Sequence, residues 1–385
     1  VRREWLAERG LTDDDLSPLS TLVLHARTAG GGQRTTLWVK HSLLRPDEEP
    51  PIPDDEPQYP WTLVDSVVGD DAAILRDRLW AAHPWLDDLP DDAIWLDYWA
   101  LLKGGLKRLA MGREGIAPVG LVDQFYGPLV EFLARSHQVE IFPYDWRHSV
   151  RKAADRLAAT IEPLVTQAER SGQPVRLVAH SMGGLVVRAM IADGGAGSAL
   201  WQRITRLPGS RFLMLGTPNL GSYEAVRWLT GCNPTQTKLA LLDITQSTDQ
   251  IIGLVSRYPG LLELLPFAAD DPDFADAGRW QTLRQETGAA WPTAEPAGLQ
   301  EAAATWKLLR AAPPDPRHMV YVAGCQPATV IDYQLTTGGD WWPPARKRLD
   351  FIATREGDGT VSWQSGRLAG VPTWYAEDTA HDALC

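Results

Sequence analysis

One stretch, residues 175–188, constrains the fold of this chain more than any other. Its first part, 175–179, is short and apolar with two valines, which predicts a strand buried on both faces. Residues 185–191 are again apolar and predict a buried helix. Ser181 and two glycines lie between them, so the sequence predicts a strand that turns sharply into a helix around a serine. We expect that a side chain at Gly183 would collide with the strand that it passes.

This turn resembles the nucleophile elbow of α/β-hydrolases. The elbow raises the serine hydroxyl clear of the sheet edge and directs the N-terminus of the helix at the place where an oxyanion would form. The backbone N–H of Met182 is therefore the predicted donor to that oxyanion. Ala179 stands where the usual pattern has glycine, and this small residue should still fit.

The composition limits the classes of function. At 385 residues, the chain can hold one large α/β domain with insertions or two modest domains. The formal net charge of −12 argues against a nucleic-acid partner and against loose docking on anionic lipid. No run of about 18 apolar residues occurs, so we expect no membrane span and at most transient contact with a lipid surface.

The cysteines and the start of the sequence bear on location. Cys232, Cys325 and Cys385 are widely spaced, which favours buried thiols over a disulfide framework and fits a reducing compartment. The sequence as given shows no signal peptide and begins on Val1, which is compatible with a piece of a longer protein. We expect a cytoplasmic location. No Cys/His cluster has zinc spacing, and we expect no metal and no cofactor.

The pattern along the chain divides it into four regions. Residues 1–90 hold weak strand signals and an acidic, proline-rich stretch that predicts a solvated linker. Residues 91–222 alternate between helices and short strands, one of them at 139–143, and predict the first part of an α/β core with a mostly parallel, doubly wound sheet. Residues 223–316 predict a helical cap insertion, and residues 317–385 the second part of the core.

A serine hydroxyl becomes a nucleophile only when a base takes its proton and an acid orients that base. In α/β-hydrolases the serine is followed by Asp or Glu and then by His, and this chain offers Asp358 and His381 in that order. Each follows a predicted strand, at 349–353 and 371–376. Loops after parallel strands gather at one edge of a sheet, where the elbow also lies. The sequence therefore predicts a catalytic triad of Ser181, Asp358 and His381.

Several motifs resemble the lecithin:cholesterol acyltransferase family, and its bacterial lipase/acyltransferase members in particular. They are FPYDWR at 142–147, AHSMGG at 179–184, GTPNLGS at 216–222, GDGTV at 357–361, and YPGLLELLP at 258–266, which is similar to the family's cap helix. The resemblance implies that Ser181 is the nucleophile, Asp358 the orienting acid and His381 the base. It also implies a lipid or another acyl ester as the substrate.

The segment 144–147 follows a predicted strand and should lie near the catalytic edge. We take Tyr144, Asp145, Trp146 and Arg147 as candidate substrate-binding residues. An alternative is that Asp145 and Arg147 pair with each other and fix the loop. We interpret His180, the residue before the serine, as a packing residue, because an elbow directs the side chains next to the serine elsewhere.

One part of the family's pattern is missing. The family has a Pro-Gly-x-x-Gly-Ser turn after an early strand, which supplies a second oxyanion donor, whereas the Pro-Gly pairs of this chain both follow the elbow. Residues 22–31 are the nearest substitute, with Ala26 as the candidate donor, and 63–69 are another. Because losing one donor lowers the rate about 10²-fold to 10³-fold, its absence would leave a weakened or inactive protein.

We therefore expect a serine-dependent lipase or acyltransferase that acts on an acyl ester through an acyl-enzyme intermediate. Two alternatives stay open. One is a small-ester or amide hydrolase without lipid preference, and the other is a non-catalytic α/β-hydrolase scaffold that acts as a binding module. The sequence predicts neither the acyl donor and acceptor nor the oligomeric state.

Overall fold

The computed structural model describes residues 21–27, 33–40, 61–68, 109–112, 116–118, 120–233, 247–268, 273–337 and 347–385. The chain divides into two compact units, Val1–Asp91 and Asp92–Cys385, and each is described by itself.

The first unit contains an antiparallel sheet. Its strands are β1 (Thr21–Arg27), β2 (Gln33–Lys40) and β3 (Trp61–Val68), in the order β1-β2-β3. Ala26 lies in β1 opposite Arg34 of β2. This sheet is separate from the parallel sheet of the second unit.

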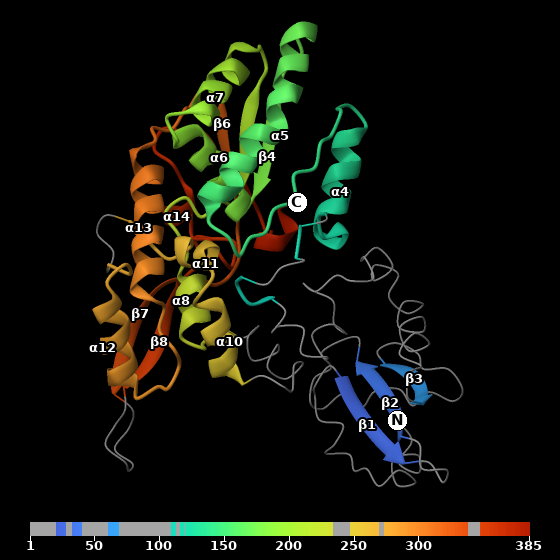
Figure 1. Ribbon diagram of the computed structural model, residues 1–385, viewed down its shortest axis with the longest axis vertical. Helices are drawn as coiled ribbons and strands as arrows, with labels where there is room; N and C mark the ends of the chain where they lie inside the picture. The colour runs from blue at the N-terminus through green and yellow to red at the C-terminus, as the bar shows by residue number, and fades with distance from the viewer. Residues whose placement is uncertain are drawn as a thin grey trace. The chain divides into compact units, whose positions relative to one another are not determined.

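The second unit contains a parallel sheet of four described strands (Figure 1). They are β4 (Arg176–His180), β5 (Arg211–Leu215), β6 (Met319–Gly324) and β9 (Thr373–Ala376), and their order is β4-β5-β6-β9. All three neighbouring pairs are parallel, so the carboxyl ends of the strands share one edge.

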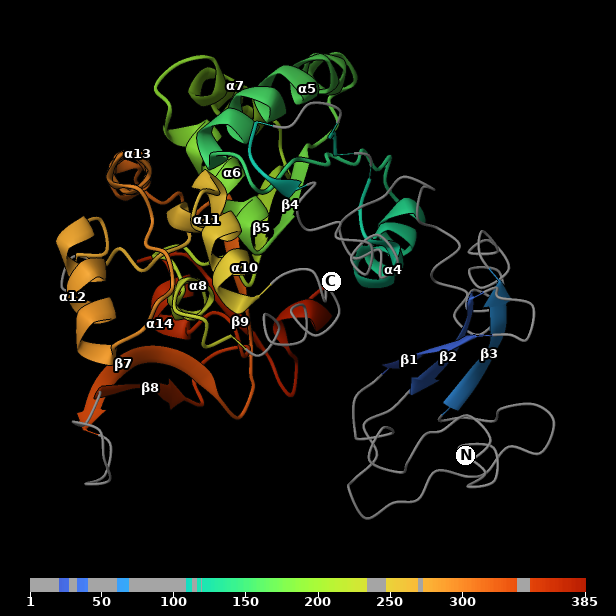
Figure 2. The same cartoon turned by 60° about the horizontal axis from the view of Figure 1, so that its bottom comes forward.

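Helices connect these strands and flank the sheet, and Figures 1 and 2 show α5, α6 and α7 grouped together on one side of it. The described helices are α4 (Asp123–Ala134), α5 (Val150–Ser171), α6 (Met182–Ala192), α7 (Ala196–Arg206), α8 (Tyr223–Leu229), α10 (Thr248–Val255), α11 (Pro259–Glu263), α12 (Ala277–Thr287), α13 (Pro296–Ala311), α14 (Trp363–Gly366) and a 3₁₀ helix, η4 (His381–Ala383).

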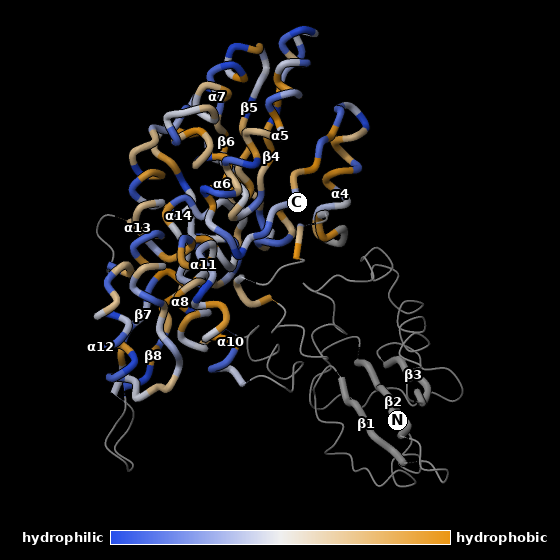
Figure 3. The backbone as a smooth tube through the Cα atoms, in the orientation of Figure 1, coloured by the Kyte–Doolittle hydropathy of each residue, from blue (hydrophilic) through white to orange (hydrophobic). Residues whose placement is uncertain are grey.

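Local sequence explains the longest of these helices, α5. The side chain of Ser149 caps its N-terminus by accepting a hydrogen bond from the backbone N–H of Arg151. The helix ends at Gly172, whose φ of 65° is the left-handed conformation that glycine adopts most readily. Hydrophobic and hydrophilic positions alternate along α5 in Figure 3, and the hydrophobic ones are buried in the core against α6 and α7.

The predicted fold class is confirmed. A parallel sheet lies between helices, the strand β4 leads directly into a helix at Ser181, and the described residues between β5 and β6 form helices α8 and α10 to α13. This is the α/β-hydrolase fold with a helical cap insertion. The expectation that the strand before Ser181 is buried on both faces is wrong, because the side chains of β4 are half-buried or exposed. None of the helices in the described residues is both long and apolar enough to cross a membrane.

The strand predicted at 349–353 exists, but the expectation that it joins the parallel sheet is wrong. It is part of β8 (Lys347–Thr354), which pairs antiparallel with β7 (Thr329–Thr337) in a sheet of its own. Polar and apolar residues are mixed along β8, and its side chains are half-buried or exposed. The strands β4 and β9 of the parallel sheet also carry polar and exposed residues, so this pattern does not determine which sheet a strand joins.

The strand predicted at 139–143 is also wrong. This segment is not a strand in the structure, and none of the described strands pairs with it. The side chain of Ile141 is 42% exposed.

Candidate active site

Ser181, His381 and Asp358 meet at the carboxyl edge of the parallel sheet. The Ser181 Oγ lies 2.8 Å from Nε2 of His381. On the other side of the ring, Nδ1 of His381 lies 2.8 Å from Oδ2 of Asp358. This line of hydrogen bonds joins segments that are 200 and 23 residues apart in the chain. It has the geometry that allows the imidazole to take a proton from the serine.

The sharp turn at Ser181 sets the direction of the hydroxyl. Ser181 has φ 53° and ψ −129°, an unusual conformation for a residue other than glycine. Its backbone N–H donates to the carbonyl of Leu215 at the end of β5. Met182 opens α6, and the backbone N–H of the first residue of a helix has no acceptor within that helix. The N–H of Met182 is therefore available to an incoming oxyanion.

The glycine that the elbow requires is Gly184, and the expectation for Gly183 is wrong. A Cβ at Gly183 would lie 3.7 Å from the Cβ of Ala179, which is ordinary van der Waals contact. A Cβ at Gly184 would lie 1.9 Å from Oγ1 of Thr217, which is too close for any side chain. The crowding comes from the loop after β5, which the sequence does not place beside the elbow.

Asp358 is only 2% exposed, and both of its carboxylate oxygens have partners. Oδ1 accepts hydrogen bonds from the backbone N–H groups of Thr360, at 2.9 Å, and Val361, at 2.7 Å. Oδ2 faces His381. The backbone of the same loop therefore fixes the orientation of the carboxylate.

The β7–β8 hairpin is inserted between the end of β6 and Asp358, and a neck closes its base. At this neck the N–H of Gln326 donates to the carbonyl of Gly357 at 2.7 Å, and the N–H of Gly359 donates to Oγ1 of Thr329 at 2.9 Å. The neck returns the chain to the end of β6. Asp358 thus reaches the edge of the parallel sheet although the strand before it lies in another sheet.

Gly216 lies directly against the pair formed by Asp358 and His381. Its φ is 56°, and a Cβ there would lie 2.8 Å from Oδ2 of Asp358 and 2.9 Å from Nδ1 of His381. This position was not among the site residues predicted from the sequence. A glycine immediately after a buried strand, at the edge where the triad is expected, is the signal that could have found it.

The motif at 144–147 is held by an internal ion pair. The guanidinium of Arg147 donates to Asp145 through Nε at 2.8 Å and Nη2 at 2.5 Å, and Nη1 donates to the carbonyl of Leu109 at 2.7 Å. Burial opposes ionisation of Asp145, but hydrogen bonds and the charge of Arg147 outweigh it and lower the pKa of Asp145. These contacts fix the conformation of the loop.

The other two residues of the motif face different neighbours. The ring of Trp146 packs edge-on against Tyr258, with the centroids 5.5 Å apart. The hydroxyl of Tyr144 lies 3.8 Å from the position of a Cβ at Gly183, so it is close to the elbow. Burial raises the pKa of Tyr144. Substrate binding by residues 144–147 stays a prediction.

The helix α11 packs beside the elbow and is hydrogen-bonded to the segment 144–147. The N–H of Gly260 donates to the carbonyl of Arg147 at 3.1 Å, and a Cβ at Gly260 would lie 2.8 Å from Cε of Met182. Glu263, at the end of α11, is 2% exposed. Its carboxylate accepts hydrogen bonds from Oγ of Ser149, the N–H of Val150 and Oγ1 of Thr305.

His180 contributes polar contacts as well as packing. Its Nδ1 lies 3.0 Å from the hydroxyl of Tyr126, and its Nε2 lies 2.7 Å from the carbonyl oxygen of His381. The interpretation of His180 as a packing residue alone is therefore wrong. A polar ring directly before the predicted nucleophile was the available signal.

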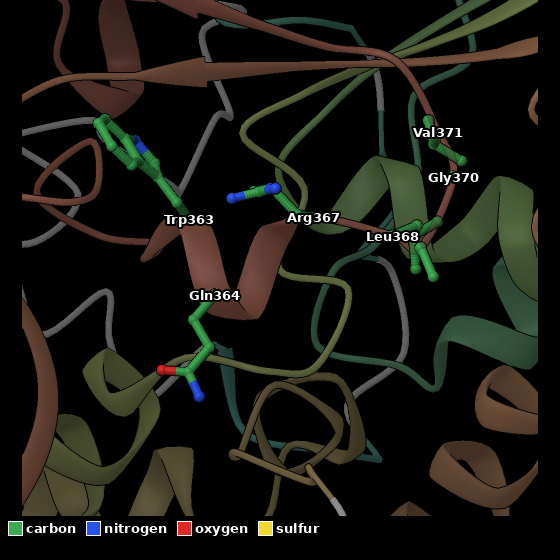
Figure 4. Close-up of a pocket in the computed structure, with 7 residues that line it drawn as sticks. Trp363, Gln364, Arg367, Leu368, Gly370 and Val371 are labelled. Carbon is green, nitrogen blue, oxygen red and sulfur yellow. The ribbon is translucent and has the colours of Figure 1, made fainter.

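A pocket lies beside two of the triad residues. Besides Asp358 and His381, it is lined by Gln326, Pro327, Ala328, Gly359, Thr360, Ala380 and Asp382. A second pocket is lined by Trp363, Gln364, Arg367, Leu368, Ala369, Gly370 and Val371 (Figure 4), and it contains none of the predicted site residues. Ala26 belongs to the first unit, and its role as second oxyanion donor stays a prediction.

Residues 126–271 match the family model of lecithin:cholesterol acyltransferase, which confirms the resemblance seen in the motifs of that range. Among solved structures, the mature form of the lipase BlEst2 from Bacillus licheniformis matches with 15% sequence identity and a TM-score of 0.29, covering 62% of this chain and 69% of that chain. No curated protein matches the sequence.

Proposed function

We propose that this chain, which matches the lecithin:cholesterol acyltransferase family over residues 126–271, is a serine-dependent lipase or acyltransferase. The observation that carries the proposal is the hydrogen-bonded line from Ser181 through His381 to Asp358, with both links at 2.8 Å. The family supports a lipid-type acyl ester as the substrate.

The reaction would begin when Oγ of Ser181 attacks the ester carbonyl carbon while Nε2 of His381 takes the hydroxyl proton. Asp358 keeps Nδ1 of the ring protonated and stabilises the imidazolium. The N–H of Met182 donates to the oxyanion of the tetrahedral intermediate. The intermediate collapses as His381 returns the proton to the leaving alcohol, which leaves the acyl group on Ser181.

The second half of the reaction repeats these roles. Water or an acceptor alcohol attacks the acyl carbonyl, and His381 takes the proton of the attacking oxygen. Collapse of the second intermediate returns that proton to Ser181 and releases a carboxylic acid or a new ester. The acceptor decides between hydrolysis and acyl transfer, and the triad serves both.

A fluorophosphonate probe tests the nucleophile. We expect it to label the wild-type chain and to leave Ser181→Ala unlabelled. No labelling of the wild type would contradict the proposal and favour a non-catalytic scaffold.

A series of esters of increasing acyl length, with Ser181→Ala as the control, tests the substrate class. We expect kcat/KM to rise with acyl length, whereas a flat or falling series would indicate a small-ester hydrolase.

A further inference from the structure

His180 lies at the meeting point of the elbow and the segment that carries the base. It is the last residue of β4 and directly precedes Ser181. Its ring is 4.7 Å from the ring of His381, with the planes tilted by 44°. The ring of Tyr126, on α4, approaches it edge-on at 5.7 Å. Three segments that are distant in the sequence therefore converge on one imidazole.

The two neighbours of His180 determine which of its nitrogens carries the proton. Nε2 faces the carbonyl oxygen of His381, which only accepts, so Nε2 must donate. In the neutral ring Nδ1 is then an acceptor, and the hydroxyl of Tyr126 donates to it. Both ring nitrogens are satisfied in a single tautomer.

The surroundings of His180 keep this ring neutral. Burial, followed by the charge of the neighbouring His381, lowers the pKa of His180 to about 4, although the hydrogen bond to the backbone of His381 and the charges of Asp358 and Asp382 act in the opposite direction. Burial also raises the pKa of Tyr126 to about 12, with a further contribution from Cys385, so its hydroxyl keeps the proton that it donates. At neutral pH, Tyr126 and His180 are therefore both uncharged, and two hydrogen bonds connect the Tyr126 hydroxyl through the His180 ring to the carbonyl of His381.

The backbone of His381 is held on both sides. Its N–H donates to the carbonyl of Asp358 at 2.9 Å, and its carbonyl accepts from His180. Without the second contact, the carbonyl loses the hydrogen bond from His180, and we expect the main chain of the base to be held less firmly. A displacement of about 1 Å in a catalytic group is enough to lower a rate 10²-fold.

We propose that His180 is a positioning residue, which holds His381 in register with Ser181 through the carbonyl of His381, and that Tyr126 fixes the tautomer that does so. This inference rests on the proposed function, because it assigns no separate chemistry. It acts on the turnover step and not on the binding of substrate.

The test compares His180→Leu with His180→Gln. The Leu and Gln side chains are similar in size. Only Gln carries an N–H donor, and its amide nitrogen is the same number of bonds from Cα as Nε2 of the histidine that it replaces. We measure kcat and KM on p-nitrophenyl butyrate, with thermal unfolding of each variant. His137→Leu, at an exposed histidine of the same unit, is the matched control, and Ser181→Ala gives the background.

We expect His180→Leu to lower kcat about 10-fold to 100-fold with KM unchanged, and His180→Gln to recover most of the loss. His137→Leu should match the wild type. A folded His180→Leu with kcat within about 2-fold of the wild type would overturn the proposal, as would equal losses in the Leu and Gln variants.

Tyr126→Phe keeps the proposal testable if the His180 variants do not fold. It removes only the hydroxyl, and we expect a smaller fall in kcat, again without a change in KM. An unchanged kcat would overturn the proposal. If the wild type itself shows no hydrolysis above Ser181→Ala and no fluorophosphonate labelling, the proposed function fails first, which is a distinct result.

Discussion

At the residue scale, the triad depends on a position that has no side chain. Gly216 leaves room for the hydrogen bond between Asp358 and His381, and its positive φ suits glycine. Any larger residue at this position must displace the carboxylate or the imidazole. The spacing between acid and base is thus set partly by a residue that takes no part in the chemistry.

Gly216→Ala should therefore lower kcat strongly. The added Cβ would lie within 2.9 Å of both the acid and the base, and we expect a loss of about 100-fold in ester hydrolysis. Gly172→Ala is the matched control, because its φ of 65° carries the same backbone penalty and no atom lies within 4 Å of the added Cβ. Equal kcat values for the two variants would contradict this explanation.

Residues that act through local sequence were predictable, and those that act through distant contacts were not. The strand, turn and helix around Ser181 follow from adjacent residues, and the order of Asp358 and His381 suggested them as partners. Gly184, Gly216 and His180 owe their importance to loops that are remote in the chain. A single sequence does not reveal which distant segments come into contact with these residues.

At the element scale, Glu263 joins three helices. It ends α11, accepts hydrogen bonds at the N-terminus of α5, and accepts another from Thr305 of α13. The cap is therefore fixed to the core by a buried carboxylate next to the elbow. The resemblance at 258–266 predicted the helix, but the sequence contains no signal for its partners.

The same carboxylate should make stability depend on pH. Burial outweighs the hydrogen bonds and raises the pKa of Glu263. The folded state then binds the proton more tightly than the unfolded state does. Its free energy of unfolding should fall as pH rises from the ordinary value for Glu through the raised value.

Glu263→Gln cannot ionise, so this part of the pH dependence should disappear. Urea unfolding across that pH range, compared with the wild type, measures the difference. Glu301→Gln, on the exposed side of α13, should keep the wild-type dependence. Parallel curves for the wild type and Glu263→Gln would show that Glu263 does not titrate as described.

Removing the Glu263 side chain altogether should be more severe. Glu263→Ala leaves the hydroxyls of Ser149 and Thr305 and the N–H of Val150 without their acceptor. We expect a loss of about 3 kcal/mol in the free energy of unfolding. A loss as small as that of Glu301→Ala would mean that water replaces the carboxylate.

Pairing between elements was the weakest part of the sequence-based prediction. The run at 349–353 was recognised as a strand, but not its antiparallel partner β7. Strand signals describe a half-buried surface and do not name the neighbour. The parallel strands β4 and β9 also mix polar and apolar residues, so the run itself held no clue to its sheet.

At the scale of the whole molecule, the three triad residues lie in the second unit, Asp92–Cys385, together with the parallel sheet. We expect a chain of residues 92–385 to unfold cooperatively and to be labelled at Ser181 by the fluorophosphonate probe. Ser181→Ala in the shortened chain is the control. A shortened chain without a cooperative transition would show that the second unit needs the first in order to fold.

The rate of that labelling also tests the prediction for Ala26. If its N–H is the second oxyanion donor, the shortened chain should react about 10²-fold to 10³-fold more slowly than the full chain. Equal rates would place the donor within the second unit. Because both chains contain the three triad residues, a difference in labelling rate would report on the oxyanion donor and not on the triad.

The neck between Gln326 and Gly357 separates the β7–β8 hairpin from the loop that carries Asp358. Because the chain is closed there, we expect substitutions further out along β7 and β8, which pack against α8 and α12, to leave the carboxylate in its place. Substitutions in the hairpin would then change the contacts that the hairpin makes without changing the proposed reaction at Ser181. We expect the proposed catalytic chemistry and the contacts of the hairpin to vary independently.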